Sequence, residues 1–209
     1  MDKAGILQQS EGTGPDENKL FELASGQQGY FTSAQAVAAG YSRSLLSHNS
    51  KEGRFVRSHH GVYRLRQYPT SPHEDLMAAW LAVGKTSVVS HESALSILQL
   101  VDTIPNQIHI TIPRSRRYKK AWPGVKIHTT IRPLTKDQVV TREGISITSP
   151  TQSILDFAES GGAPEQVGRA TSQALQKGLI TRSRLIEAAQ QRSERIERLV
   201  SSALAESTG

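Results

Sequence analysis

Residues 40–65, GYSRSLLSHNSKEGRFVRSHHGVYRL, combine short polar side chains with a high density of positive charge. Arginine and lysine bind phosphate oxygens, and serine and arginine also donate hydrogen bonds to the edges of nucleic-acid bases. Across residues 41–66, six basic residues stand against one acidic residue, Glu52. This excess of positive charge predicts an anionic partner. The six basic residues are Arg43, Lys51, Arg54, Arg57, Arg64 and Arg66.

Two short helices separated by a glycine turn are predicted to position these side chains. The first begins with Thr32 or Ser33 as its N-cap and ends at Gly40, because glycine accepts the left-handed conformation found after helix C-termini. Ser42 caps the second helix almost at once. This is the spacing of a helix-turn-helix, in which the start of the second helix enters the major groove of DNA.

Two short alternating strands follow, at 55–56 and 62–65, and Gly61 gives the turn between them its conformational freedom. Such a pair forms a wing that reaches phosphates or a minor groove. An alternative is a small helical domain whose basic face contacts another protein, but the motif and the local charge together favour DNA. The candidate DNA-binding residues are Ser42, Arg43, Ser44, Ser47, His48, Lys51, Arg54, Arg57, His59 and His60.

At 209 residues the chain is long enough for two modest domains. The sequence YPTSP at 68–72 is the expected linker, because two prolines within five residues interrupt regular structure. We expect an α+β protein in which the helix-turn-helix domain precedes a mixed α/β domain with a small antiparallel sheet and C-terminal helices. The predicted segments are a flexible leader at 1–14, the winged helix-turn-helix at 15–67, the linker at 68–72 and the C-terminal domain at 73–209.

A second concentration of positive charge lies between two predicted strands, at 107–113 and 125–130. Residues 113–142 hold nine basic residues and one acidic residue. If the two strands pair as a hairpin, residues 114–124 form their connecting loop. This second basic patch suits a phosphate backbone or an acidic protein surface, and it is equally compatible with a solvated loop whose lysines protect an edge strand. It comprises Arg114, Arg116, Arg117, Lys119, Lys120, Lys126 and Arg132.

The chain lacks the residue patterns of common enzymes. It has no cysteine, and its seven histidines include no His-Glu-x-x-His motif. His59 and His60 are adjacent on a turn, and His91-Glu92 lies where helix capping explains the polar residues. We therefore predict no catalytic site, no metal site and no cofactor. The absence of a long apolar run predicts a cytoplasmic location without membrane contact.

Residues 31–65 resemble the N-terminal winged helix-turn-helix of AbiEi-type antitoxins from type IV toxin-antitoxin systems. GYSRSLLS followed by GRFVR and GVYRL carries the resemblance, which continues more weakly through VVSHESALSILQL, IHITIPR and ITSPTQSILDFA. The resemblance implies a transcriptional autorepressor that binds its own operator as double-stranded DNA. It also implies a C-terminal antitoxin domain that counteracts a nucleotidyltransferase-like toxin, directly or indirectly.

The sequence departs from that family where relatives continue the second helix with apolar residues and a further basic one. Here His48, Asn49 and Ser50 follow, so we expect the helix to end early and DNA affinity to be modest, with Lys51 compensating in part. Two alternatives stay open: a winged-helix regulator without a toxin partner, and a protein-interaction module. The sequence leaves the oligomeric state open.

Overall fold

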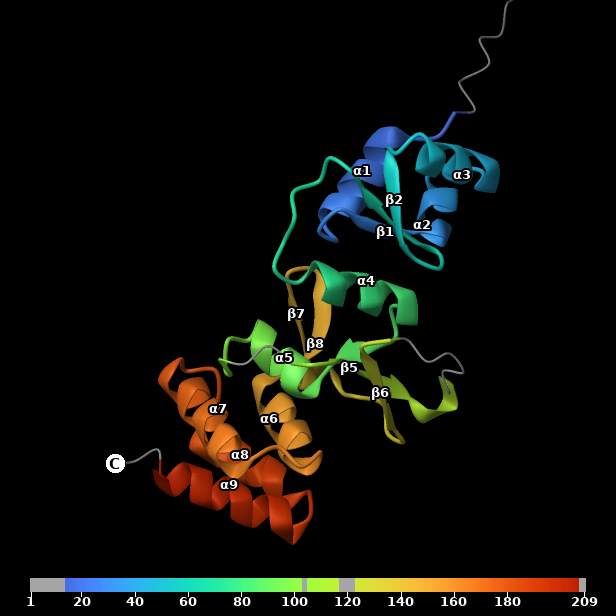
Figure 1. Cartoon of the computed structure of the whole chain (residues 1–209). Coiled ribbons are helices and arrows are strands. Elements are labelled where there is room, and N and C mark those ends of the chain that lie inside the picture. The colour runs from blue at the N-terminus through green and yellow to red at the C-terminus, as the bar shows by residue number, and fades with distance from the viewer. Residues whose placement is uncertain (1–13, 103–104, 117–122, 207–209) are drawn as a thin grey trace, which may run out of the picture. The chain divides into compact units, whose positions relative to one another are not determined.

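The chain forms two compact units, one extending to Thr70 and the other starting at Ser71 (Figure 1). The structure is a computed structural model that describes residues 14–102, 105–116 and 123–206. Each unit combines helices with its own sheet, so the predicted α+β class is confirmed. The expected leader at 1–14 falls almost entirely outside the described residues.

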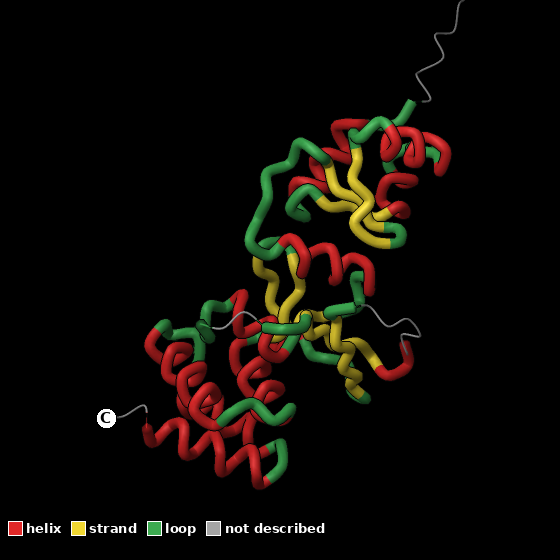
Figure 2. Tube along the Cα trace, viewed as in Figure 1, coloured by secondary structure: helices red, strands yellow, loops and turns green. Residues whose placement is uncertain are grey.

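The first unit has the helices and strands of a winged helix (Figure 2). Its strands form an antiparallel sheet in the order β1-β3-β2. Strand β1 is a three-residue element that the sequence analysis did not predict, and it pairs with the wing strand β3. The elements are α1 (Glu17–Ser25), β1 (Tyr30–Thr32), α2 (Ser33–Ala38), α3 (Arg43–Lys51), β2 (Phe55–His59) and β3 (Val62–Leu65).

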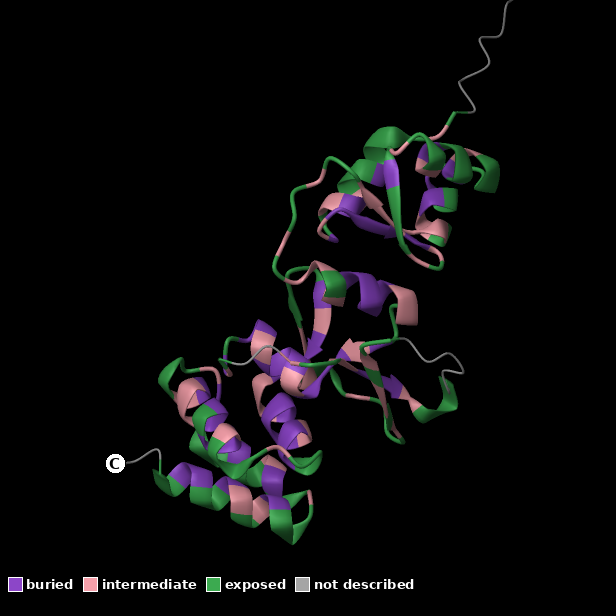
Figure 3. Ribbon diagram, viewed as in Figure 1, coloured by how far each residue is buried: buried purple, intermediate pink, exposed green. Residues whose placement is uncertain are grey.

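An aromatic cluster forms the core of this unit. The rings of Phe31 and Phe55 meet edge to face with centroids 5.0 Å apart, and Tyr41 lies 5.8 Å from Phe55. Edge-to-face contacts of this kind add to the stabilisation that burial of the rings already provides. Each of the three helices buries residues in the same cluster: Leu20 and Ala24 of α1, Ala36 of α2 and Leu46 of α3. The three helices are therefore held by one shared core (Figure 3).

The second unit contains a five-stranded sheet and six α-helices within its described residues. None of the helices in the described part of the chain is long and apolar enough to cross a membrane. The elements are α4 (Glu74–Val83), β4 (Val88–Val89), α5 (His91–Ile97), β5 (Ile108–Pro113), η1 (Arg114–Arg116), β6 (Val125–Thr130), η2 (Lys136–Gln138), β7 (Val139–Arg142), β8 (Ile145–Thr148), α6 (Pro150–Glu159), α7 (Pro164–Gln176), α8 (Arg182–Gln190) and α9 (Glu194–Glu206).

The strands of this sheet run in the order β6-β5-β4-β8-β7. Antiparallel pairs join β4 to β5 and β7 to β8, whereas β4 pairs with β8 in parallel. Strands β5 and β6 are also parallel, with Ile108 opposite Val125 and Pro113 opposite Thr130. The hairpin interpretation of residues 107–130 is therefore wrong. Alternating side chains predict strands, but strand direction depends on tertiary pairing, and here that pairing is parallel.

Helix α6 follows the sheet directly and carries a buried carboxylate. Ser149 occupies the N-cap position of this helix without a side-chain capping hydrogen bond, and Pro150 lies in its first turn. Burial raises the pKa of Asp156 to about 6, against an ordinary value of 3.8. Arg192, in the turn between α8 and α9, opposes this shift with its guanidinium 3.3 Å from Asp156 Oδ1. The ion pair thus links the C-terminal helices to α6.

The substitution Arg192→Gln is expected to destabilise the second unit more at pH 7.5 than at pH 4.5. Because the folded-state pKa of Asp156 lies above its unfolded value, ionisation of this carboxyl removes stability as pH rises through about 4 to 6. Loss of Arg192 raises that pKa further, and the added loss of stability from this carboxyl at pH 7.5 is about 2 kcal/mol at most, because the carboxyl can stay protonated and keeps its hydrogen bond from Gln152. Both tryptophans lie after residue 71, so tryptophan fluorescence during urea unfolding follows this unit. Equal destabilisation at the two pH values would contradict a raised pKa of Asp156 opposed by Arg192.

Candidate nucleic-acid interface

Helix α3 presents a polar face to solvent because its opposite face is buried in the core. Leu46 is 2% exposed and Asn49 is 3% exposed, and both point into the first unit. The residues of this helix and its cap that were predicted to contact DNA are all exposed (Figure 3). The structure therefore brings six of the ten candidates onto one surface, which we call the α3 face. It consists of Ser42, Arg43, Ser44, Ser47, His48 and Lys51.

In the turn before α3, Gly40 has the predicted left-handed conformation and Ser42 is the predicted N-cap. Gly40 has a φ of +87°, and a Cβ atom there would lie 3.2 Å from the Cα of Pro15. Ser42 accepts a hydrogen bond from the backbone N–H of Leu45 at 3.1 Å, and so caps α3. Thr32 caps α2 in a capping box with Gln35. These contacts confirm the predicted caps and fix the position of α3 relative to α2.

Helix α3 does not end early. It continues to Lys51, and Asn49, which was expected to interrupt it, instead supports its C-terminal turn. The buried Asn49 amide donates to the carbonyl oxygen of Leu45 at 2.8 Å, while its Oδ1 accepts a hydrogen bond from Arg54 at 3.3 Å. Because its hydrogen bonds are satisfied, this polar side chain is compatible with burial at a core position. Lys51 therefore lies on the last turn of the helix.

The wing places two further candidates near each other. Arg57 Nη2 lies 3.1 Å from His60 Nδ1, and both residues are exposed. A β-bulge between Arg57 and His59 changes the strand register, and Gly61, with a φ of +76°, completes the turn. His59 is half-buried. The tip of the wing thus combines one permanent positive charge with two imidazole rings.

A shallow cleft of about 380 Å³ separates α3 from strand β2. Three basic side chains, Lys51, Arg57 and Arg66, line it together with two serines of α3. Arg66 was not among the predicted contact residues, and its Nε donates to the carbonyl oxygen of Gly53 at 2.5 Å. Arg66 directly follows the predicted wing strand at 62–65, and this position could have indicated that it lies beside the wing. Cations on both sides of a groove are suited to binding a phosphate backbone.

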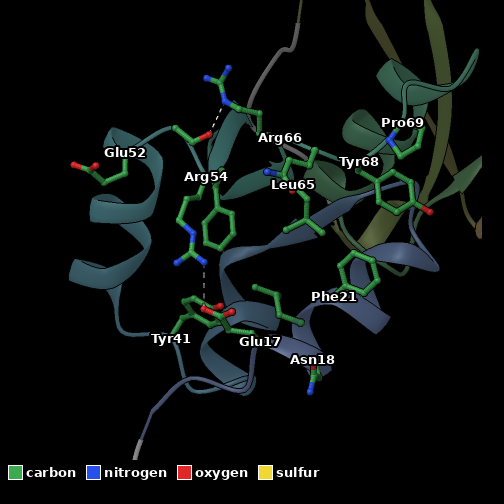
Figure 4. Close-up of a pocket in the computed structure, with 14 residues that line it drawn as sticks. Glu17, Asn18, Phe21, Tyr41, Glu52, Arg54, Leu65, Arg66, Tyr68 and Pro69 are labelled. Atoms are coloured by element: carbon green, nitrogen blue, oxygen red, sulfur yellow. Dashed lines mark hydrogen bonds and ion pairs between the residues drawn. The ribbon is translucent and has the colours of Figure 1, made fainter.

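Arg54 lies apart from the α3 face. Its guanidinium is 3.5 Å from Glu17 of α1, at a larger concavity of about 730 Å³ (Figure 4). Two carboxylates, Glu17 and Glu52, line this concavity, and Phe21 beside them is 57% exposed. Because the guanidinium of Arg54 pairs with Glu17, we leave Arg54 out of the candidate interface.

The second basic patch lies in the second unit. Arg114, Arg116, Lys126 and Arg132 are exposed, and Arg116 donates to the hydroxyl of Thr86 at 2.8 Å. The other predicted members, Arg117, Lys119 and Lys120, lie outside the described residues. The contribution of this patch to binding stays a prediction.

Three histidines that the sequence analysis did not group together meet in the second unit. One ring nitrogen from each of His91, His109 and His128 lies within 4.8 Å of the other two. The three histidines are far apart in the sequence, and they meet only because β5 pairs in parallel with β6. The sequence alone therefore did not reveal the cluster. The period-two positions of His109 and His128 in adjacent strands were a weak signal for it.

Residues 18–66 match the family model described as "Transcriptional regulator, AbiEi antitoxin". This match confirms the resemblance for most of the first unit, which is similar to that family. No match was found among the curated proteins. Among solved structures, the chain is similar to the crystal structure of RV2827C protein from Mycobacterium tuberculosis, with a TM-score of 0.57 and 15% identity over 91% of this chain and 76% of that chain. At this identity the likeness shows the fold alone.

The substitution Asn49→Ala is expected to destabilise the first unit by about 1–3 kcal/mol, because it removes a hydrogen bond to Leu45 within α3 and one from Arg54 in the turn before β2. His48→Ala is the matched control, since an exposed neighbour on the same helix changes stability by about 0.5 kcal/mol or less. Calorimetric unfolding of both variants measures the difference. Equal stability of the two variants would remove Asn49 from this supporting role.

Proposed function

We propose that the α3 face and the wing bind duplex DNA, with α3 in the major groove. The observation that carries this proposal is the joint exposure of short polar and basic side chains on α3 beside a cleft lined by Lys51, Arg57 and Arg66. Arg43 and Ser44 begin the helix, where side chains of a recognition helix reach base edges. The cations of the cleft contact phosphates and fix the register.

We further propose that the chain is an antitoxin and autorepressor of a type IV toxin-antitoxin operon. The family match over residues 18–66 covers the same α3 face and wing, and it supports both parts of this function. On this proposal the first unit represses the operon by binding its own operator. The second unit counteracts a nucleotidyltransferase-like toxin, and its second basic patch contacts either DNA or the toxin.

The substitution Arg43→Ala is expected to weaken operator binding by about 1–3 kcal/mol and to relax sequence preference, because Arg43 reads a base edge. Arg57→Ala is expected to weaken binding to all sequences alike and to lower the slope of log affinity against log salt by about 0.9, the value for one lost phosphate contact. Fluorescence anisotropy with DNA from upstream of the gene measures both effects.

Arg54→Ala is the matched control for these two variants. It removes an arginine of the same unit whose guanidinium contacts Glu17 and Asn49 and does not line the cleft. Wild-type affinity and salt slope are expected for this control after its fold has been verified by circular dichroism. If Arg43→Ala bound operator like wild type while Arg54→Ala lost affinity, the assigned face would be wrong.

Residues 71–209 expressed alone are expected to rescue growth in the presence of the cognate toxin without repressing the promoter, because the second unit has its own core and sheet. Residues 1–70 are expected to repress without rescue. A growth assay with a promoter-linked reporter measures both activities. Rescue by residues 1–70 would reverse the assignment, and repression without a toxin gene nearby would favour a stand-alone regulator.

A further inference from the structure

The three histidines of the second unit form one cluster from three separate elements. His91 begins α5, His109 lies in β5 and His128 lies in the neighbouring edge strand β6. His128 Nε2 is 3.2 Å from His109 Nδ1, and the ring of His91 stacks on that of His128 with centroids 3.6 Å apart. The residues are brought together by tertiary structure and not by a local turn.

The surrounding backbone holds this cluster in place. Strands β5 and β6 pair with Thr111 opposite His128 and His109 opposite Lys126, so both histidines lie on one face of the sheet. The backbone N–H of Ser90 donates to the carbonyl oxygen of His109 at 3.0 Å. His91 follows with a φ of +54°, a conformation that costs a residue other than glycine about 1 kcal/mol or more and is concentrated at functional sites.

Hydrogen bonding determines which nitrogen of His91 is available. Its Nδ1 lies 2.8 Å from the hydroxyl of Ser90, which in turn lies 2.7 Å from the hydroxyl of Thr111. Nε2 is therefore left as the coordinating atom. An oxygen that fixes the second ring nitrogen is the usual outer-shell partner of a metal-binding histidine.

The three rings are neutral at physiological pH. Burial lowers the pKa of His91 to about 3 and that of His128 to about 4, and it also lowers the pKa of His109. A neutral imidazole offers the lone pair that a metal requires. His91 is 8% exposed, whereas His109 and His128 are half-buried, so the cluster has one open side.

We propose that His91, His109 and His128 bind one divalent transition-metal ion of the zinc class, with a fourth position open to water. Imidazole nitrogens suit zinc, copper and nickel, whereas magnesium and calcium prefer oxygen. Tetrahedral ligands about 2.0–2.1 Å from zinc lie about 3.3 Å apart. The nitrogens of His109 and His128 already have about that separation, and a ring nitrogen of His91 lies within 4.8 Å of both.

Two positively charged side chains near the cluster allow a second measurement of metal binding. Lys126 and Arg192 both act on His91 through their positive charge. The same field opposes a bound cation, so Lys126→Gln is expected to tighten metal binding several-fold. If substitutions altered metal affinity only by disturbing the fold, Lys126→Gln would not raise that affinity. Lys126 is exposed on the edge strand, which makes this substitution structurally mild.

The test uses the tag-free full chain after removal of metal by chelator, in the absence of DNA and toxin. Calorimetric titration with Zn²⁺ is expected to show one ion per chain, and Co²⁺ is expected to give the intense visible absorption of tetrahedral nitrogen coordination. His109→Asn and His128→Asn are each expected to weaken binding by about 100-fold or more, and Ser90→Ala by about 10-fold. His60→Asn, on the exposed wing, is the control and is expected to leave binding unchanged.

Failure to bind Zn²⁺ at micromolar concentration would overturn the proposal, and the cluster would then be a hydrogen-bonded group of neutral imidazoles. Retention of tight binding in both His109→Asn and His128→Asn would also overturn it. If His109→Asn or His128→Asn no longer shows a tryptophan fluorescence transition, that variant is unfolded and the Lys126→Gln variant becomes the test. Unchanged metal affinity in Lys126→Gln would then contradict the proposal. DNA binding by the first unit can fail without affecting this result.

Discussion

The burial of Leu46 in the aromatic core of the first unit determines how α3 is rotated about its axis. Complete burial of a leucine side chain stabilises a fold by about 1.5–3 kcal/mol, which exceeds what any exposed residue of this helix contributes. With Leu46 beside Tyr41 and Phe55, the opposite side of α3 must face water. The same core holds α1 and α2, so the position of the α3 face follows from packing. Asn49 extends this anchoring through hydrogen bonds, and it lets the helix continue to Lys51.

Charge differs between two concavities of this small unit. The charged residues that line the cleft between α3 and the wing, Lys51, Arg57 and Arg66, are all basic. On the other concavity, the carboxylates of Glu17 and Glu52 are matched by Arg54 and Arg66 (Figure 4). A polyanion is therefore attracted more strongly to the first. Local positive charge therefore supports the proposed function more strongly than the net charge of +6 does. The family match over residues 18–66 and this distribution of charge favour the same surface.

Local rules predicted local structure well. Gly40 and Ser42 could be recognised because left-handed glycine and N-cap serine act within one turn of the chain. The strand β1 was missed because three residues are too few for a period to be visible, and its place in the sheet depends on β3. The direction of β6 was predicted wrongly because it is decided by partners distant in sequence. For the same reason the cluster of His91, His109 and His128 could not be found, although each histidine was visible in the sequence.

DNA recognition by α3 is tested most directly by a nuclear magnetic resonance titration of the ¹⁵N-labelled chain with the DNA upstream of its gene. The largest changes in amide chemical shift are expected on α3 and on the wing around Arg57 and Gly61, and they are expected to saturate at lower concentration than with unrelated DNA. Glu17 and Phe21, on the other concavity, should change little. Changes confined to that concavity, or the absence of any change on α3 at saturating DNA, would contradict the central claim that α3 is the recognition helix.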